Sequence, residues 1–288
     1  MVIIKIVFSI KVYQNTNLGF IKVEIKMIEN KKLLLDICNI AILAGDEILH
    51  FYNKDIEVTH KDDSSPLTKA DLASNKIIID LLSSLDSDIP ILSEESLVDW
   101  NSRKNWNKYW LVDPLDGTKE FIKNNGEFTV NIALIENNNP ILGVIFVPAK
   151  STLYFAQKEY GSFSLHTSVK LNSLDEAKKI TVTKQSNIVR VIGSRSHSNN
   201  IFTNWINEKF PNAEIVQSGS SLKFCLIAKG EADIYPRFGP TSEWDIAAGH
   251  IILNEAGGKI LTLDNKEIIY NEKESVLNPE FIASNNTI

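Results

Sequence analysis

The chain has 288 residues, of which 43% are hydrophobic and 23% charged, and its formal net charge is −6. These values are typical of a globular protein that can bury an extensive core, and they exclude a disordered, collagen-like or coiled-coil chain. The acidic balance argues against nucleic-acid binding, which needs an excess of Lys and Arg on one face. Cys38 and Cys225 lie far apart in apolar stretches, which favours core thiols in a reducing compartment over a disulfide.

The N-terminal segment differs from the rest. Residues 1–13 are apolar but contain Lys5 and Lys11, so the segment is too short and too charged to span a bilayer. It also lacks the small-residue cleavage site of a secretory signal. We therefore predict that residues 1–26 are an extension outside the catalytic unit, with Met27 as an alternative translation start. Residues 27–288 then form one unit of two lobes, 27–165 and 166–288.

Hydrophobic periodicity predicts an α+β front half and an α/β back half. The turn of Asn and Pro at 137–140 indicates that the strands on either side of it pair as a hairpin. Gly257 and Gly258 mark the end of the last helix. The predicted elements are helices 32–52 and 70–85, strands 109–112, 128–135, 141–147 and 152–155, strand 188–192, helices 199–209 and 219–229, strand 232–235 and helix 243–256.

The most informative stretch is Trp110-Leu-Val-Asp-Pro-Leu-Asp-Gly-Thr118. An apolar strand ends at Asp113, Pro114 fixes the backbone between two carboxylates, and Gly117 permits a tight turn before a helix-like start. Hard divalent cations prefer carboxylate and carbonyl oxygens, and phosphates bind backbone N–H groups, so this segment is suited to hold both. The alternative is a capped turn with solvated acids, which is the commoner meaning of Asp-Gly-Thr alone.

Three further acidic positions are candidates for the same site. Glu94 and Glu95 follow a short apolar strand, and one of them can join the cluster. Asp245 lies in the first turn of the last helix, where the helix dipole favours a carboxylate. Asp71 lies at the start of the second helix, where an ordinary cap is the alternative. Each signal is weak when taken separately.

Together these segments resemble the inositol monophosphatase superfamily of lithium-sensitive, Mg²⁺-dependent phosphatases. The superfamily signature corresponds to residues 110–118, and a second signature to Trp244-Asp245 followed by Ala-Ala-Gly. Within the superfamily the chain most resembles the bacterial 3′(2′),5′-bisphosphate nucleotidases. The stretches that carry this finer resemblance are Lys119-Glu-Phe-Ile122, Gly126-Glu-Phe-Thr-Val-Asn131, Gly193-Ser-Arg-Ser-His197, Gly219-Ser-Ser-Leu-Lys-Phe-Cys225 and Tyr235-Pro-Arg-Phe-Gly-Pro240.

The resemblance, which covers about residues 28–284, implies a layered αβαβα sugar-phosphatase-like fold and two or three Mg²⁺ ions. The implied metal ligands are Glu94, Asp113, Asp116 and Asp245 through their side chains, and Leu115 through its carbonyl. Glu94 is chosen over Glu95 because it matches the first acid of the family's pair. Asp71 and Thr118 resemble the pair that helps to activate the attacking water. The implied substrate-binding residues are Glu94, Leu115, Asp116, Gly117, Thr118, His197, Ser220, Lys223, Arg237 and Asp245.

The implied reaction is hydrolysis of the 3′-phosphate of adenosine 3′,5′-bisphosphate to AMP and phosphate, by in-line attack of a metal-activated water. The sulfated 3′-phosphonucleotide is a further implied substrate. Structural roles remain as alternatives for the nucleotide contacts: Ser220 as a helix cap, His197 as a structural histidine, and Lys223 and Arg237 as solvated charges.

Two other functions remain open at this point. One is the same chemistry on inositol monophosphate or another sugar phosphate, because metal ligands are shared while pocket residues differ. The other, from a different class, is a catalytically inactive nucleotide-binding sensor. The expected partner is a small-molecule substrate, with no nucleic acid, no transmembrane segment and an open oligomeric state. The resemblance implies a cytoplasmic protein and leaves peripheral attachment to the inner membrane open.

Overall fold

The computed structural model describes residues 18–54, 58–60, 66–184, 188–195 and 200–287. The chain divides into two compact units, residues 1–33 and 34–288. Helix α1 (Leu18–Phe51) runs through this division, so the proposed boundary at residue 26 falls within a continuous helix.

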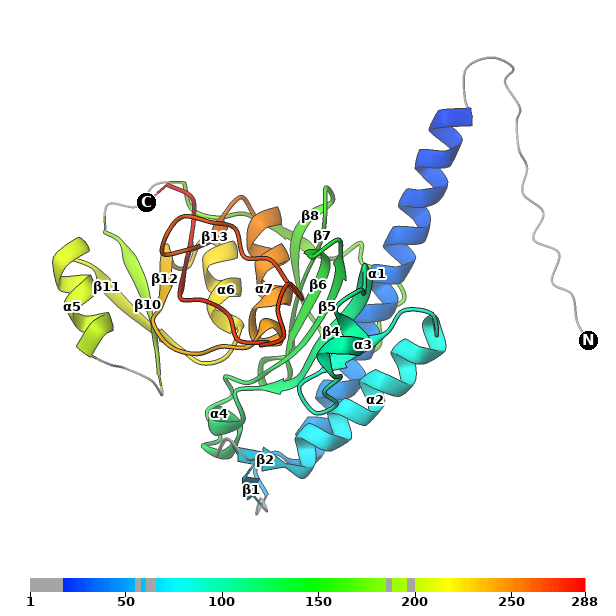
Figure 1. Cartoon of the computed structure of the whole chain (residues 1–288), viewed down its shortest axis with the longest axis horizontal. Helices are drawn as coiled ribbons and strands as arrows, with labels where there is room; N and C mark the ends of the chain where they lie inside the picture. Colours follow the sequence, from blue (N-terminus) through cyan, green and yellow to red (C-terminus); the bar gives the residue numbers. More distant parts are fainter. Residues whose placement is uncertain (1–17, 55–57, 61–65, 185–187, 196–199, 288) are drawn as a thin grey trace, which may run out of the picture. The chain divides into compact units, whose positions relative to one another are not determined.

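A seven-stranded sheet forms the front half of the larger unit (Figure 1). Its strand order is β3-β4-β5-β6-β7-β8-β9, and only the first pair is parallel among these strands. The predicted hairpin is confirmed, because β5 and β6 pair antiparallel across the Asn turn. The strands are β3 (Ile91–Ser93), β4 (Lys108–Asp116), β5 (Thr129–Glu136), β6 (Asn139–Val147), β7 (Thr152–Gln157), β8 (Gly161–His166) and β9 (Lys178–Ile180).

A five-stranded sheet forms the back half, in the order β11-β10-β12-β14-β13. The first three strands of this order are parallel, and β14 pairs antiparallel with its neighbours on both sides. Its strands are β10 (Arg190–Ser194), β11 (Glu214–Ser218), β12 (Ile234–Arg237), β13 (Lys259–Thr262) and β14 (Phe281–Ser284). A short separate hairpin joins β1 (Val58–His60) to β2 (Pro66–Thr68).

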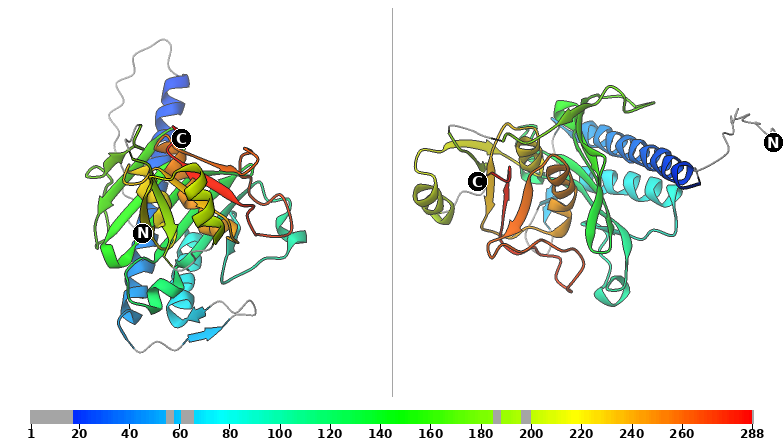
Figure 2. Two further views of the ribbon diagram at one scale, coloured as in Figure 1. Left: turned by 90° about the vertical axis from the view of Figure 1, so that its left-hand side faces the viewer. Right: turned by 90° about the horizontal axis from the view of Figure 1, so that it is seen from above.

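Helices lie on both faces of each large sheet, which gives the predicted αβαβα layers (Figure 2). Helices α1 and α2 cover one face of the seven-stranded sheet, α6 and α7 fill the space between the two sheets, and α5 covers the outer face of the five-stranded sheet. The remaining helices are α2 (Lys69–Leu85), α3 (Trp100–Arg103), α4 (Thr118–Ile122), the 3₁₀ turn Pro148–Lys150, α5 (Asn200–Lys209), α6 (Leu222–Ala228) and α7 (Glu243–Glu255).

Helix α7 is fixed in the central layer by close packing on both sides. The apolar core between the sheets includes Ile251 and Phe224, both buried. A Cβ at Gly143 of β6 would lie 2.4 Å from a side-chain carbon of Ile251, and a Cβ at Gly249 would lie 2.4 Å from the ring of Phe224. Both glycines therefore permit contacts that any larger residue would block. This packing sets the position of the first turn of α7, which carries Asp245.

Several predicted boundaries were wrong. Strand β4, predicted as 109–112, continues to Asp116, because it still pairs with β5 there. Helix α1 begins at Leu18 and not near residue 32, because residues 18–31 contain no proline and their polar run consists of good helix formers. Helix α6 covers Leu222–Ala228, since residues 219–221 form a turn before it. Strand β12 covers Ile234–Arg237 and so reaches two residues beyond the predicted 232–235. The last helix ends as predicted, with Gly257 in the left-handed region at φ 95°.

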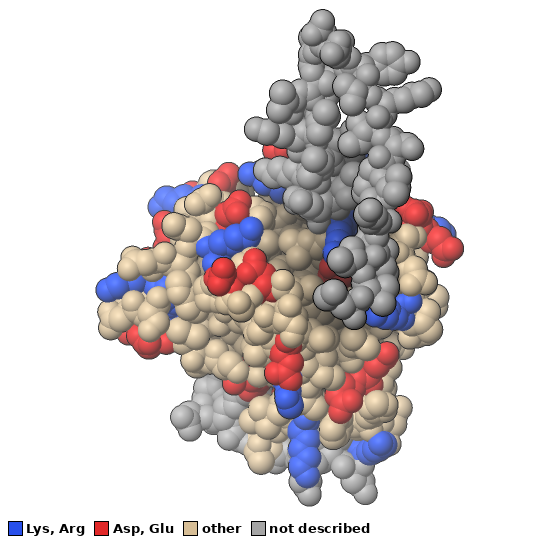
Figure 3. Space-filling view, turned by 90° about the vertical axis from the view of Figure 1, so that its right-hand side faces the viewer, with Lys and Arg blue, Asp and Glu red and all other residues tan. Residues whose placement is uncertain are grey.

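On the face shown in Figure 3, Lys and Arg are interspersed with Asp and Glu and do not gather in a stripe. A stripe of one sign would be expected of a surface that tracks a phosphate backbone. In the stretches of chain that the structure describes, no helix is both long and apolar enough to cross a membrane.

Candidate active site

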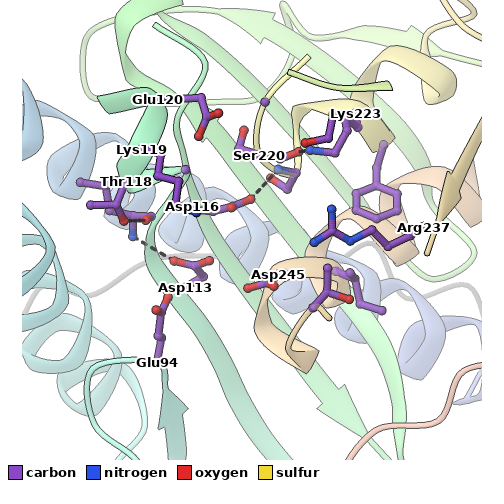
Figure 4. Close-up of a pocket in the computed structure, with 18 of the residues that line it drawn as sticks. Glu94, Asp113, Asp116, Thr118, Lys119, Glu120, Ser220, Lys223, Arg237 and Asp245 are labelled. Carbon is purple, nitrogen blue, oxygen red and sulfur yellow. Dashed lines mark hydrogen bonds between the residues drawn. The ribbon is translucent and has the colours of Figure 1, made fainter. Parts of the chain in front are cut away.

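A cavity of about 250 Å³ opens between the carboxyl end of β4, the start of α7 and the turn before α6. Figure 4 shows Glu94, Asp113 and Asp116 on one side of the opening, Lys223 and Arg237 on the other, and Asp245 between them. We call Glu94, Asp113, Asp116 and Asp245 the acidic wall, and Lys223 and Arg237 the basic wall. The predicted residues that line the cavity are Glu94, Asp113, Leu115, Asp116, Gly117, Thr118, Ser220, Lys223, Arg237 and Asp245.

A β-bulge explains how two aspartates three residues apart face one cavity. Successive side chains of a regular strand point to opposite faces, so Asp113 and Asp116, three residues apart, would diverge. In the pairing of β4 with β5, Asp113 lies opposite Asn131 but Asp116 lies opposite Thr129, so β4 holds one extra residue. A bulge of this kind re-aims a side chain. The Pro114 carbonyl in the bulge accepts a hydrogen bond from the Ser74 hydroxyl at 2.7 Å.

The main chain orients three carboxylates of the acidic wall. In each aspartate, one oxygen accepts a hydrogen bond from a backbone N–H group. The donor and acceptor pairs are Leu115 N to Asp113 Oδ1 at 3.1 Å, Ser242 N to Asp245 Oδ2 at 2.8 Å, and Ser221 N to Asp116 Oδ2. Each carboxylate is therefore held in a fixed direction by secondary structure, and not only by contacts with other side chains.

Glu94 enters the acidic wall from the neighbouring strand. Strand β3 runs parallel to β4, with Ser93 opposite Val112, and the amide of Glu94 donates to the Val112 carbonyl at 3.1 Å. The residue after β3 therefore lies beside the end of β4, because the carboxyl ends of parallel strands meet at one edge of a sheet. Glu94 lines the cavity.

The carboxylates of the acidic wall stabilise the protonated form of one another. Burial, followed by the charges of Glu94, Asp116 and Asp245, raises the pKa of Asp113 well above its usual value. Burial raises the pKa of Asp116 to about 6, although Lys223 opposes this rise. Burial and the charge of Asp116 raise the pKa of Asp245 to about 8. Such a concentration of buried like charges is typical of a site that binds a cation.

The donor set fits a hard divalent cation. Four carboxylates and the Leu115 carbonyl supply oxygen, which is the ligand atom that Mg²⁺ prefers. Among the residues that the structure describes, no three Asp, Glu, His or Cys side chains are already drawn together into a group that would hold a metal ion. A bound cation would offset the repulsion between these carboxylates.

Asp71 and Thr118 meet beside the acidic wall. The Thr118 hydroxyl lies 3.2 Å from Asp71 Oδ1 and 3.4 Å from the Leu115 carbonyl oxygen. The other Asp71 oxygen accepts from the Thr68 amide and hydroxyl, at 2.8 and 2.6 Å. The predicted cap at the start of α2 is therefore present, and the same carboxylate also contacts Thr118. Burial raises the pKa of Asp71, and the hydrogen bonds from Thr68 oppose that rise.

Backbone carbonyls hold the basic wall. Lys223 is 7% exposed, and its Nζ donates to the Ser220 carbonyl at 2.5 Å. Burial lowers the pKa of Lys223 to about 8, although the charge of Asp116 opposes this fall. Arg237 donates from Nε to the Gly239 carbonyl at 3.2 Å and from Nη2 to the Pro240 carbonyl at 2.7 Å. The remaining predicted contact, His197, lies outside the described residues.

Several cavity residues were not predicted to take part in the site. Glu120 and Lys119 of α4 line it, as do Ser221 and Tyr235. The buried Tyr235 ring lies beneath Lys223 Nζ, 5.3 Å from the ring centroid, a geometry that suits a cation–π contact. All four residues lie in the stretches that carry the resemblance. Their sequence positions could have identified them as candidates. Their contacts could not have been predicted, because they depend on tertiary packing.

The fold and the acid-lined cavity define a class of phosphatase. The family model described as the Inositol monophosphatase family matches residues 30–287 of the chain. The chain therefore belongs to this family. The solved structure of a Thermotoga maritima IMPase shares the fold, with a TM-score of 0.72 at 24% identity over 87% of this chain and 91% of that one.

The relatives with higher sequence identity are described by one specific activity within the family. The chain is 45% identical to the 3′(2′),5′-bisphosphate nucleotidase CysQ of Salmonella typhimurium, over 86% of this chain and 98% of that protein. It is 47% identical to the nucleotidase of the same name from Buchnera aphidicola, over 88% and 94% of the two chains. The crystal structure of CysQ from Bacteroides thetaiotaomicron has a TM-score of 0.79 at 39% identity, over 88% and 97%.

Proposed function

We propose that the protein is a 3′(2′),5′-bisphosphate nucleotidase that removes the 3′-phosphate of adenosine 3′,5′-bisphosphate. The observation that carries the proposal is a single cavity with an acidic wall and a basic wall. A nucleoside 3′,5′-bisphosphate carries two phosphates on different oxygens of one ribose, so each wall can take one of them. The activity described for the relatives supports the same substrate class.

The acidic wall and the Leu115 carbonyl would hold two or three Mg²⁺ ions. When bound, Mg²⁺ would lower the pKa of an attacking water and neutralise charge on the phosphate. The oxygen-only donor set supports Mg²⁺, which prefers six oxygens at about 2.0–2.1 Å, over softer metals. Ca²⁺ is larger and accepts looser geometry, so we expect it to occupy the site and inhibit. Inhibition by Li⁺ is a further prediction from the family.

In this proposal Asp71 and Thr118 orient the water and accept its proton. The Thr118 hydroxyl contacts the Asp71 carboxylate, whose raised pKa favours proton uptake. Gly117 and Thr118 begin α4 at the cavity, where a backbone amide and a hydroxyl can bind phosphate oxygens. In-line attack by water then releases the nucleoside monophosphate, and the mechanism requires no covalent intermediate with the enzyme.

The basic wall would bind the phosphate that does not react. Lys223 and Arg237 supply two positive charges, and an Arg side chain suits phosphate recognition because its planar fork can donate two parallel hydrogen bonds. Ser220 and His197 are further proposed contacts to the nucleotide. The sulfated 3′-phosphonucleotide carries the same 3′-phosphate and is a second proposed substrate.

The experiment is a phosphate-release assay with adenosine 3′,5′-bisphosphate, inositol monophosphate and fructose 1,6-bisphosphate, each with Mg²⁺ and with a chelator. We expect the adenosine substrate to have the highest kcat/KM and all activity to stop in the chelator. Preference for inositol monophosphate would identify a sugar phosphatase instead. Binding of the nucleotide without phosphate release from any substrate would indicate a sensor.

A further inference from the structure

One turn connects the two walls of the cavity. Residues 219–221 precede α6, and the Ser221 amide donates to Asp116 of the acidic wall. The Ser220 carbonyl in the same turn accepts from Lys223 of the basic wall at 2.5 Å. Ser220 has φ 46°, a left-handed conformation that costs free energy for a residue other than glycine. Something outside the turn must therefore hold it in this shape.

Glu127, two residues before β5, and Thr129 and Asn131 of β5 hold this turn. Glu127, Thr129 and Asn131 are spaced by two, so an extended backbone directs all three side chains to the same side. The contacts are Gly219 N to Glu127 Oε2 at 2.9 Å, Thr129 Oγ1 to Ser221 Oγ at 2.8 Å, and Ser221 Oγ to Asn131 Oδ1 at 2.7 Å. The stretch 126–131 thus has a structural role that the proposed reaction does not use.

Glu127 differs from the other two because it also contacts a second loop. Its carboxylate accepts from Arg195 Nε at 2.8 Å and from Arg195 Nη2 at 2.9 Å. Arg195 follows Ser194, which lines the cavity, and it also donates to the Gln217 carbonyl at 3.1 Å. The Glu127 side chain is 12% exposed and that of Arg195 is 42% exposed. The carboxylate is therefore shielded at the point where it joins the two loops.

We propose that Glu127 is a positioning residue that sets how tightly the cavity binds its substrate. Its carboxylate joins the 219–221 turn to Arg195 after β10 and so fixes the turn whose Ser220 carbonyl holds Lys223 of the basic wall. It contacts neither the acidic wall nor the side chain of Lys223 through a hydrogen bond that the described residues show. The proposal deepens the nucleotidase assignment and rests on it for the identity of the substrate.

The first test does not depend on any substrate. In Glu127→Gln the side chain keeps its size but loses its charge, so the Gly219 amide loses a charge-assisted hydrogen bond. We expect amide hydrogen exchange at residues 219–221 to become about tenfold faster. Glu136→Gln is the matched control, because Glu136 is the last residue of β5, which begins two residues after Glu127, and pairs with Lys108 at 3.5 Å with both side chains 42% exposed. Unchanged exchange in Glu127→Gln would overturn the proposal.

The second test separates positioning from general damage to the fold. For adenosine 3′,5′-bisphosphate we expect Glu127→Gln to raise KM about tenfold at unchanged kcat, and Glu136→Gln to change neither. Arg195→Gln, which leaves the Gly219 contact intact, should raise KM less. The double variant should raise it by less than the product of the two single effects, since both remove one shared contact. A fall in kcat with unchanged KM would contradict the positioning role.

These measurements also keep the two proposals apart. If the wild type releases no phosphate from adenosine 3′,5′-bisphosphate, the nucleotidase assignment fails, and the exchange rates still decide whether Glu127 holds the turn. KM is then compared on whichever phosphate ester the wild type hydrolyses. If Glu127→Gln does not fold, Arg195→Gln provides the same two readouts, and an unchanged KM in that variant would count against the proposal.

Discussion

The two walls of the cavity are held in opposite ways. Carboxylates of the acidic wall accept hydrogen bonds from backbone N–H groups of β4, the 219–221 turn and the start of α7. The cations of the basic wall donate to backbone carbonyls, which lie in the 219–221 turn and the loop after β12. In both walls the main chain therefore fixes the orientation of charged side chains, and the two walls carry charges of opposite sign.

This difference separates the chemistry from the choice of substrate. The acidic side chains are short, and the aspartates come from a strand bulge and a helix start that tertiary packing fixes firmly. The cations are carried on long side chains whose positions depend on loop carbonyls. We therefore expect changes in the acidic wall to affect every phosphate ester, and changes in the basic wall to affect substrates with a second phosphate.

The largest effect is expected from Asp116→Asn. Loss of this charge should lower kcat by at least about a hundredfold on every substrate, because the carboxylate is a proposed metal ligand. The thermal transition of the metal-free protein should stay near that of the wild type, since one of several repelling buried charges is removed. Asp80→Asn is the control, because its ion pair with Lys76 is on the surface. Near-normal activity of Asp116→Asn would remove Asp116 from the metal site.

A smaller and selective effect is expected from the basic wall. Replacing Lys223 or Arg237 by Met keeps much of the side-chain volume and removes the charge. For adenosine 3′,5′-bisphosphate, kcat/KM should fall about tenfold to a hundredfold, the size of about 1.4–3 kcal/mol for a lost charge-assisted contact. Activity on inositol monophosphate, which has no second phosphate, should hardly change. Lys229→Met serves as the control, since Lys229 pairs with Glu231 outside the cavity.

An equal loss of kcat/KM on adenosine 3′,5′-bisphosphate and inositol monophosphate would contradict the separate roles of the two walls. It would mean that the cations act by balancing the acidic wall, and the charges are close enough for this to be a real alternative. The charge of Lys223 lowers the pKa of Asp116, and that of Arg237 lowers the pKa of Asp245, each against a larger rise caused by burial.

A substitution at His250 tests whether the free energy of unfolding can change while both walls of the cavity stay unaffected. His250 is 6% exposed, and its Nδ1 lies 2.9 Å from the Tyr270 hydroxyl. Burial lowers its pKa from 6.5 to about 4, so below pH 6.5 the unfolded chain binds a proton that the folded protein does not. The contribution of neutral His250 to the free energy of unfolding is therefore fully present above pH 6.5 and is lost as pH falls toward 4. Between pH 7 and 5 the wild type should lose about 2 kcal/mol more than His250→Gln.

Urea unfolding at the two pH values measures this difference. The titration of the acidic wall is common to both proteins and cancels in the comparison. An identical pH dependence of the free energy of unfolding in the two proteins would show that His250 is not buried in its neutral form. Substrate preference at pH 7 should be the same in both.

The smallest effect is expected from deleting residues 1–26. The described residues that line the cavity begin at Glu94, and the larger compact unit begins at residue 34. The deletion removes the first residues of α1 but no part of that unit. We expect unchanged kcat/KM on both substrates, measured beside the full-length chain. Aggregation or lost activity would show that the extension supports the catalytic unit.

The sequence predicted the elements that local patterns define. The second helix (predicted 70–85) corresponds to α2, the hairpin follows its Asn turn, and the last helix ends at Gly257, because each has a periodicity or turn signal within a few residues. Strands β13 and β14 were not predicted, since each is four residues long and is defined by pairing with distant partners. The start of α1 was also missed, because polar helix formers resemble a linker.

For the site, the sequence identified the acidic residues but not how they converge. The bulge between Asp113 and Asp116 exists only in the register of β4 against β5. The left-handed Ser220 depends on contacts from β5, and no local rule favours serine there. The alternation of Glu127, Thr129 and Asn131 was visible, but the turn that these residues hold lies about ninety positions away in the chain. The cytoplasmic location and membrane attachment stay predictions.

The most direct test of the two-wall account is to identify the product of adenosine 3′,5′-bisphosphate hydrolysis by ³¹P NMR. If the acidic wall performs the reaction and the basic wall holds the other phosphate, the wild type with Mg²⁺ should yield adenosine 5′-monophosphate and inorganic phosphate. Lys223→Met should yield the same product more slowly. Adenosine 3′-monophosphate as the product of the wild type would contradict the account, because the reacting phosphate would then be the one assigned to the basic wall.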